Sequence, residues 1–127
     1  MFVQLQSIFN FFNFYETIKN QKLSMKTAYQ LARLSKIIDT ELQFYKEEMQ
    51  KILQEFGEMD KNGNLIFTDD GKGIKLRPGI ENECYKAIKE LQEVEVELPD
   101  IKFNIEDFGE VKLSSIEIES IIPFIKE

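Results

Sequence analysis

The chain has 127 residues and a formal net charge of -7, with one cysteine and neither histidine nor tryptophan. This length can bury a core without metals or disulfides, and 43% hydrophobic with 31% charged residues is typical of folded proteins rather than disordered ones. A single cysteine excludes an intrachain disulfide, and the lack of histidine removes the commonest general base and metal ligand. We therefore expect one domain over residues 1–127, with no enzymatic activity and no cofactor.

The first segment, MFVQLQSIFNFFNFY, carries no charged side chain. It lacks a basic start and is shorter than the ~20 residues of a spanning helix, so we expect a cytosolic amphipathic element rather than a signal peptide or a membrane anchor. Apolar residues at spacings of three and four predict a helix within residues 1–20. Phe11 and Phe14 lie off this stripe, which indicates either burial on two sides or an aromatic surface for a partner.

A second helix is expected from the N-cap Ser24 to Phe56, with Gly57 as a left-handed C-terminal stop. Its apolar residues alternate at steps of three and four, which is typical of a coiled-coil seam. The seam consists of Ala28, Leu31, Ser35, Ile38, Leu42, Tyr45, Met49, Ile52 and Phe56.

Four further apolar residues widen the seam beyond a two-stranded one: Leu34, Ile37, Phe44 and Leu53. Acidic residues flank the seam, so antiparallel or intramolecular packing is favoured over a parallel dimer. The predicted interaction residues are Leu31, Ile37, Ile38, Leu42, Phe44, Tyr45, Met49 and Ile52 of this helix, Phe11 and Phe14, and the acidic residues Glu93, Glu95 and Glu97.

The rest of the chain predicts short elements separated by turns. Asn-Gly and Asp-Gly pairs indicate a hairpin of Leu65–Phe67 with Ile74–Leu76, followed by a helix over Ile80–Gln92. Alternation predicts strands at EVEVEL and over residues 101–105, and a capping box predicts a helix over Ser115–Ile122. The expected fold is α+β: a helical hairpin over residues 1–57, then a small α+β part over residues 58–127 with a β-hairpin or sheet and two short helices.

No motif indicates a catalytic, cofactor or metal site. Asp60-Lys61-Asn62-Gly63-Asn64 imitates the start of a calcium loop, but Leu65 and Gly71 stand where the loop requires glycine and glutamate. A hairpin turn is therefore favoured. Cys84, at an apolar helix position, is interpreted as a small buried hydrophobe rather than a reactive thiol.

Charge is concentrated in the C-terminal part. From Glu81 onward there are 13 acidic residues and 5 lysines. This excess disfavours nucleic acid and anionic membranes as partners and is compatible with a basic protein partner, although acidic residues also simply keep a surface solvated.

Four segments carry a resemblance: KLSMKTAYQLARLSKIIDTEL, QEFGEMDKNGN, ELQEVEVELPDIKF and LSSIEIESIIPFI. Over Gln21 to Lys126, the chain resembles a family of small proteins of uncharacterised function from tailed bacteriophages and prophages of Gram-positive bacteria. The resemblance implies action in the host cytoplasm or the virion and brings no catalytic residues. We expect a virion or assembly component or an oligomeric adaptor, a homo-oligomer or a binder of a host protein. The alternative is an acidic inhibitor or decoy for a host nucleic-acid-binding or defence protein.

Overall fold

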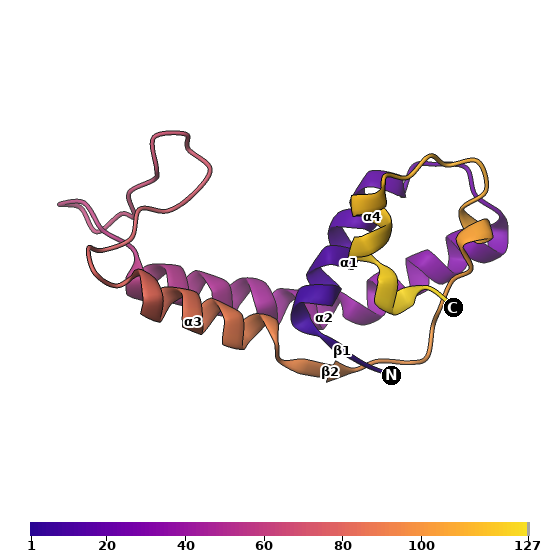
Figure 1. The fold of residues 1–127 in the computed structure, drawn as a ribbon, viewed down its shortest axis with the longest axis horizontal. Coiled ribbons are helices and arrows are strands. Elements are labelled where there is room, and N and C mark those ends of the chain that lie inside the picture. The colour runs from indigo at the N-terminus through magenta and orange to yellow at the C-terminus, as the bar shows by residue number, and fades with distance from the viewer. Residues whose placement is uncertain (127) are drawn as a thin grey trace. The chain divides into compact units, whose positions relative to one another are not determined.

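The structure is a computed structural model and describes residues 1–126. Within this range it is α+β, with a two-stranded antiparallel sheet and four α-helices (Figure 1). The chain divides into a large unit, Met1–Gln43 with Val94–Glu127, and a small unit, Phe44–Glu93. This division differs from the expected boundary after residue 57, because the long helix contributes its first part to one unit and its second part to the other.

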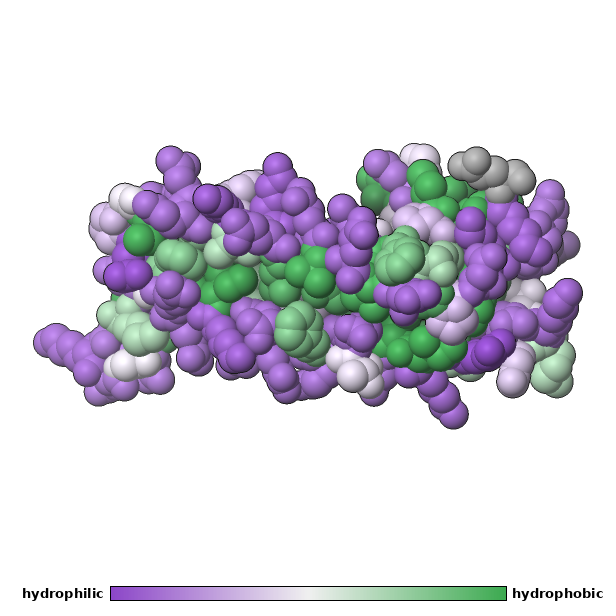
Figure 2. Space-filling view, turned by 90° about the horizontal axis from the view of Figure 1, so that it is seen from below, coloured by the Kyte–Doolittle hydropathy of each residue, from purple (hydrophilic) through white to green (hydrophobic). Residues whose placement is uncertain are grey.

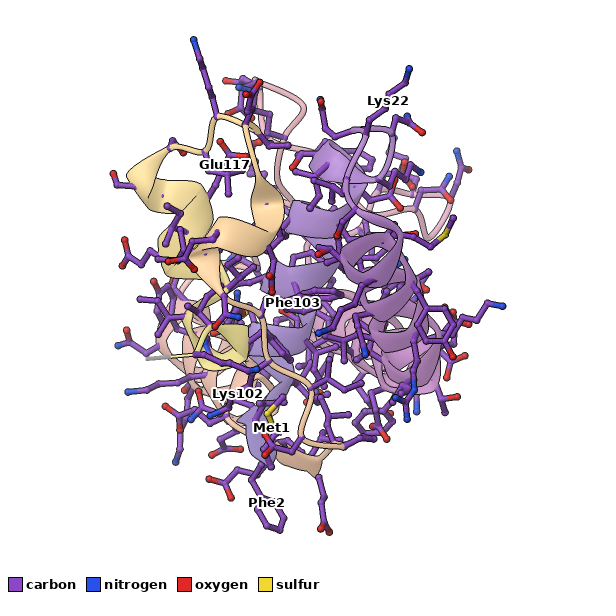
Figure 3. The ribbon with its side chains drawn as sticks, turned by 90° about the vertical axis from the view of Figure 1, so that its right-hand side faces the viewer. Met1, Phe2, Lys22, Lys102, Phe103 and Glu117 are labelled. Carbon is purple, nitrogen blue, oxygen red and sulfur yellow. The ribbon has the colours of Figure 1, made fainter. Side chains whose placement is uncertain are left out.

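The sheet of the large unit joins the start of the chain to a distant segment. β1 (Phe2–Gln4) pairs antiparallel with β2 (Glu95–Glu97), and Val3 lies opposite Val96. Val3 is buried, whereas Phe2 is 67% exposed and points away from the body of the protein (Figure 3). The prediction of a helix over residues 1–20 was therefore wrong for the first residues, which alternate between inside and outside as a strand does.

α1 (Leu5–Ile18) buries only part of the predicted stripe: Leu5, Ile8 and Ile18 are buried, whereas Phe9, Phe12 and Tyr15 are half-buried. Phe11 and Phe14, expected off the stripe, are 1% and 3% exposed. The ring of Phe11 lies 5.1 Å from that of Phe124, and Phe14 meets Phe108 edge to face at 5.5 Å. Burial inside the chain, one of the two alternatives, is confirmed, and an aromatic surface at these two positions is wrong.

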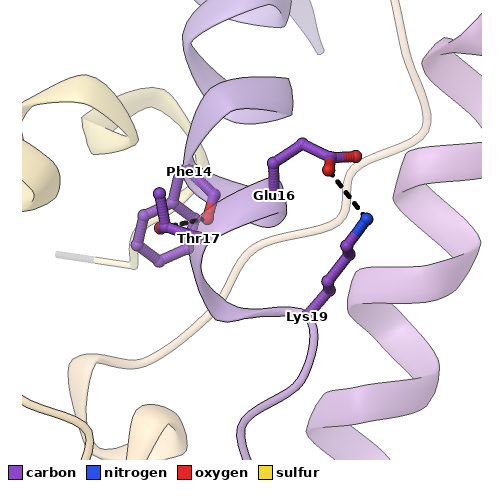
Figure 4. Close-up of polar contacts among 4 residues, drawn as sticks. All are labelled: Phe14, Glu16, Thr17 and Lys19. Atoms are coloured by element: carbon purple, nitrogen blue, oxygen red, sulfur yellow. Dashed lines mark hydrogen bonds and ion pairs between the residues drawn. The ribbon is translucent and has the colours of Figure 1, made fainter.

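Polar contacts at the end of α1 involve mainly exposed groups (Figure 4). Lys19 Nζ pairs with Glu16 at 2.7 Å, and the Thr17 hydroxyl donates to the carbonyl oxygen of Phe14 at 2.7 Å. The Glu16 carboxylate raises the pKa of Lys19 by accepting this hydrogen bond and by its charge. Since exposed ion pairs stabilise proteins little, the buried face and not this pair holds α1 in place.

α2 (Met25–Phe56) confirms the predicted long helix. The backbone N–H of Thr27 donates to Ser24 Oγ at 3.3 Å, which is the predicted N-cap. In the large unit its buried row contains Thr27, Leu31, Leu34, Ile38 and Leu42. Leu31, Ile38 and Leu42 of the predicted seam are therefore buried as expected. Thr27 and Leu34 are buried in place of two other seam residues, Ala28, which is exposed, and Ser35, which is half-buried.

The C-terminal segment completes the core of the large unit. Ile101 and Phe103 are buried, but only Phe103 forms a bridge, to Ile125 in parallel. The expected strand over residues 101–105 is wrong: only an isolated bridge forms at Phe103, and Asn104 forms a capping box that opens the 3-10 helix η1 (Ile105–Phe108).

Two short helices end the described chain. The predicted capping box of Ser114 and Glu117 is confirmed and opens α4 (Ser115–Ser120), which contacts α1. α4 is shorter than expected, since a further 3-10 helix, η2 (Ile122–Phe124), begins after it, with Pro123 in its first turn.

The loops of the small unit form a closed ring of three paired segments. The backbone N–H of Glu58 donates to Lys75, that of Lys75 to Ile66, and that of Ile66 back to Glu58, at 2.8, 2.8 and 2.9 Å. The predicted hairpin is present as a bridge between Phe67 and Ile74, and the segment after α2 pairs with both of its arms.

Gly57 ends α2, but not as predicted. Its φ is not positive, so it is not a left-handed stop. A Cβ at this position would lie 2.5 Å from the Leu53 carbonyl oxygen, 2.5 Å from Leu65 Cδ2 and 3.1 Å from Ile74 Cγ2. Glycine is required here because the ring of segments approaches the helix end too closely for a side chain.

α3 (Glu81–Gln92) confirms the predicted helix, with Cys84 and Leu91 buried. Arg77, just before it, donates from its backbone to the Phe56 carbonyl and from its guanidinium to the Glu55 carbonyl, at 3.0 and 2.7 Å. These bonds satisfy carbonyls at the C-terminal end of α2, where a cation is also favoured by the helix dipole.

Candidate interaction surfaces

The predicted interaction residues of α2 are divided between the two units. In the large unit, Leu31, Ile38 and Leu42 are 1–5% exposed and belong to the core. Ile37 is half-buried in the same unit. These core positions pack inside the chain, so they offer no surface to a partner.

The remaining α2 residues belong to the small unit. Tyr45 is 5% exposed, Met49 and Ile52 are half-buried, and Phe44 is 44% exposed. Apart from Tyr45, these side chains are partly exposed and leave apolar area available for contact with another molecule.

The small unit has a thin core. Among the described residues, its only buried apolar side chains are Tyr45, Cys84 and Leu91, while the other buried ones all belong to the large unit. Figure 2 shows apolar atoms reaching the surface between hydrophilic ones over the small unit, on the left of the view. Its half-buried apolar residues are Met49, Ile52, Leu53, Phe56, Leu65, Ile66, Ile74, Leu76, Ile80, Ala87 and Ile88.

Loop residues add further apolar area to the small unit. Met59 and Phe67 are 45% and 62% exposed and line the same shallow depression. The adjacent turn is held by Asp60, whose Oδ1 accepts the backbone N–H groups of Asn62 and Asn64 at 2.8 and 3.0 Å. This turn is the hairpin turn that was favoured over a calcium loop.

The three predicted acidic residues are all exposed: Glu93, Glu95 and Glu97. The last two lie on the outer face of β2 and pair in register with Gln4 and Phe2. Val96 points to the inner face, as the alternation predicts, but Val94, also expected inside, is 43% exposed. The outer face of the sheet is therefore acidic, with one exposed phenyl ring.

Sequence reasoning missed a basic groove in the large unit, with a volume of about 320 Å³. α2 forms one wall, and the segment after β2 together with the last described residue forms the other. The lining residues are Lys26, Thr27, Gln30, Arg33, Asp100, Ile101, Lys102, Phe103, Asn104, Asp107 and Lys126. Their spacing in the sequence gives no motif, because they come from three separate stretches.

The single thiol is unsuited to nucleophilic chemistry at neutral pH. Cys84 is 2% exposed, and burial raises the pKa of its thiol. The thiolate is the reactive form, so a raised pKa and a buried position both oppose reaction. Among residues 1–126, no three histidine, cysteine or acidic side chains are grouped so that they could hold a metal ion.

Within the described residues, none of the helices combines the length and apolar character required to cross a membrane. Comparison of the chain with protein-family models finds no match, and neither do comparisons with curated proteins and with solved structures.

Proposed function

We propose that this chain is a non-enzymatic protein-interaction protein that assembles with a second copy of itself through its small unit. The proposal rests on the small number of fully buried apolar side chains in the described part of that unit. Resemblance to a phage family supports the role of a virion or assembly component, or of an oligomeric adaptor, in the virion or the host cytoplasm.

The physical reason is the small amount of apolar surface that the small unit buries by itself. Units of about 50 residues are marginal unless metals, disulfides or association add stability. Its only cysteine is free, and its turns are held by their own backbone hydrogen bonds. Covering the half-buried side chains of α2 would contribute roughly 25 cal/mol for each Å² of apolar area removed from water.

Self-association is expected to depend on one row of α2. Met49 and Leu53 lie four residues apart on one helix face and are half-buried. Replacing both with lysine places two charges in the proposed contact and is expected to weaken dimerisation at least roughly tenfold. Sedimentation velocity over a range of protein concentrations measures the change.

Gln50→Lys with Gln54→Lys is the matched control, because both residues are exposed and the pair adds the same charge at the same spacing on the same helix. The control should associate like the wild type. Circular dichroism shows whether each variant keeps its helices. A wild-type chain that remains monomeric at every concentration contradicts the proposal, and so does equal weakening in the control.

A second candidate is an acidic inhibitor that occupies the nucleic-acid groove of a basic protein. The exposure of Glu93, Glu95 and Glu97 favours it, since exposed carboxylates can present negative charge to a basic groove.

Its test is competition: the chain should displace a labelled DNA duplex from a basic, sequence-independent DNA-binding protein. Reversing Glu93, Glu95 and Glu97 to lysine should abolish the displacement. Reversing the exposed Glu81, Glu83 and Glu90 instead, which changes the net charge equally, should leave it in place. Absence of displacement at low salt, or equal loss in both variants, rules this candidate out.

A further inference from the structure

The basic groove brings four cationic side chains together: Lys26 and Arg33 of α2, Lys102 after β2, and Lys126. Only two acidic residues, Asp100 and Asp107, line the same space, so the groove has an excess of two positive charges. The whole chain, in contrast, has a net charge of -7. Within residues 1–126, the ion pairs involve other lysines, so all four groove cations are unpaired.

A helix and backbone hydrogen bonds position the residues that carry these four cations. Lys26, Gln30 and Arg33 follow each other at steps of four and three, which puts them on one face of α2 beside its buried row. On the other wall, the Phe103 N–H donates to the Phe124 carbonyl and the Lys126 N–H donates to the Phe103 carbonyl, both at 2.7 Å. The segments that carry Lys102 and Lys126 are therefore joined by backbone hydrogen bonds.

Gln30, which lines the groove, carries an unsatisfied acceptor. The Oε1 atom of Gln30 is buried and has no hydrogen-bond partner in the described structure. A buried acceptor without a donor is costly, so a ligand that supplied an N–H or O–H would recover that cost. Asp107 is already engaged, since its Oδ2 accepts the Asn104 N–H at 2.9 Å, whereas Asp100 is exposed and can accept from a ligand.

We infer that the basic groove binds a small phosphate monoester that also carries hydroxyl or amino groups. A phosphate monoester has a charge of about -1.5 to -2 at neutral pH, which matches the excess of two cations. Its hydroxyl or amino groups would donate to Gln30 and Asp100. The volume of about 320 Å³ is at the small end of the range for small-molecule sites, as expected for one sugar phosphate.

Ribose 5-phosphate is a suitable probe, with ribose and inorganic phosphate as its two halves. In a titration of the full chain followed by amide NMR shifts, ribose 5-phosphate should give saturable changes at Lys26–Arg33 and Asp100–Asn104. Ribose alone should give none, because it lacks the charge. Inorganic phosphate should bind roughly tenfold more weakly, because it lacks the sugar hydroxyl groups that would donate to Asp100 and Gln30.

The charge requirement is tested with two double variants of equal charge. Arg33→Glu with Lys102→Glu should weaken binding of ribose 5-phosphate at least roughly tenfold. Lys22→Glu with Lys112→Glu is the control, since both lysines are exposed, belong to the large unit and lie outside the groove. Figure 3 shows Lys22 at the top of the view and Lys102 below its middle.

The role of the unsatisfied acceptor has its own test. Gln30→Leu should remove the preference for ribose 5-phosphate over inorganic phosphate while leaving the binding of inorganic phosphate unchanged. Three results would overturn the inference: no saturation by ribose 5-phosphate, equal weakening in the two charge variants, or shifts spread over lysines outside the groove. Since the groove belongs to the large unit, failure of self-association through the small unit leaves this test unaffected.

Discussion

Replacing Phe11 by alanine is expected to lower the free energy of unfolding by about 3–5 kcal/mol, the largest effect of any substitution proposed here. The side chain is 1% exposed, and its ring contacts those of Phe124 and Tyr15 with centroids 5.1 and 6.3 Å apart. Truncation removes the transfer free energy of the ring and leaves a cavity that α1 and η2 can close only in part. Urea denaturation followed by circular dichroism measures the loss.

Phe2→Ala is the control for this change. The two substitutions remove the same atoms, but Phe2 is 67% exposed, so its loss should alter stability by no more than about 0.5 kcal/mol. Similar losses for the two variants would contradict the position of Phe11 in the core. Phe11 would then belong to an aromatic surface, which is the other alternative that the sequence allowed.

Gly57→Ala is expected to destabilise the chain by about 1–3 kcal/mol, although alanine usually stabilises a helix relative to glycine. The added methyl group would lie 2.5 Å from the Leu53 carbonyl oxygen, which is backbone and also accepts the Gly57 N–H at 2.8 Å. Relief therefore requires a shift of the helix end or of the three paired segments. Thermal unfolding of the wild type and of Gly57→Ala measures the loss of stability. Amide NMR of residues 57–76 measures the shift of the helix end and of the paired segments.

Gly73→Ala serves as the comparison in the same loops. A Cβ there would meet Thr68 side-chain atoms at 3.6 and 3.7 Å, which is ordinary contact, and its φ is not positive. This variant should be close to neutral. If Gly57→Ala were equally neutral, the close approach at the end of α2 would be wrong.

The helices could be predicted because their signals are local. The seam of α2 and its cap, Ser24, lie within one continuous stretch, and the capping box of Ser114 and Glu117 defines the start of α4. Such signals depend on side-chain spacing and on nearby backbone groups, which are fixed by the helix itself.

The errors come from partners that are distant in the sequence. β1 exists because it pairs with β2 more than 90 residues later, and nothing in FVQ alone distinguishes a strand from the first turn of a helix. In α1, phenyl rings occur on nearly all sides, so periodicity could not identify the buried face. The contacts with Phe108 and Phe124 decide it in favour of Phe11 and Phe14.

The basic groove was missed for a related reason. Lys26 and Arg33 occupy polar positions of an amphipathic helix, where a charge usually faces solvent, and Lys102 lies in the acidic C-terminal part. The bridge between Phe103 and Ile125 joins the stretches of Lys102 and Lys126, which lie far apart in the sequence. The net charge of the C-terminal part is therefore negative, whereas the charge in the basic groove is positive.

The ring formed by Glu58, Ile66 and Lys75 also bears on aggregation. In an open sheet the outermost strands keep unsatisfied amide groups that can recruit a strand from another molecule. Here each of the three segments is a neighbour of the other two, so at these residues no strand is outermost. Despite its exposed Phe67 and Met59, this part of the chain is thus a poor template for cross-β growth.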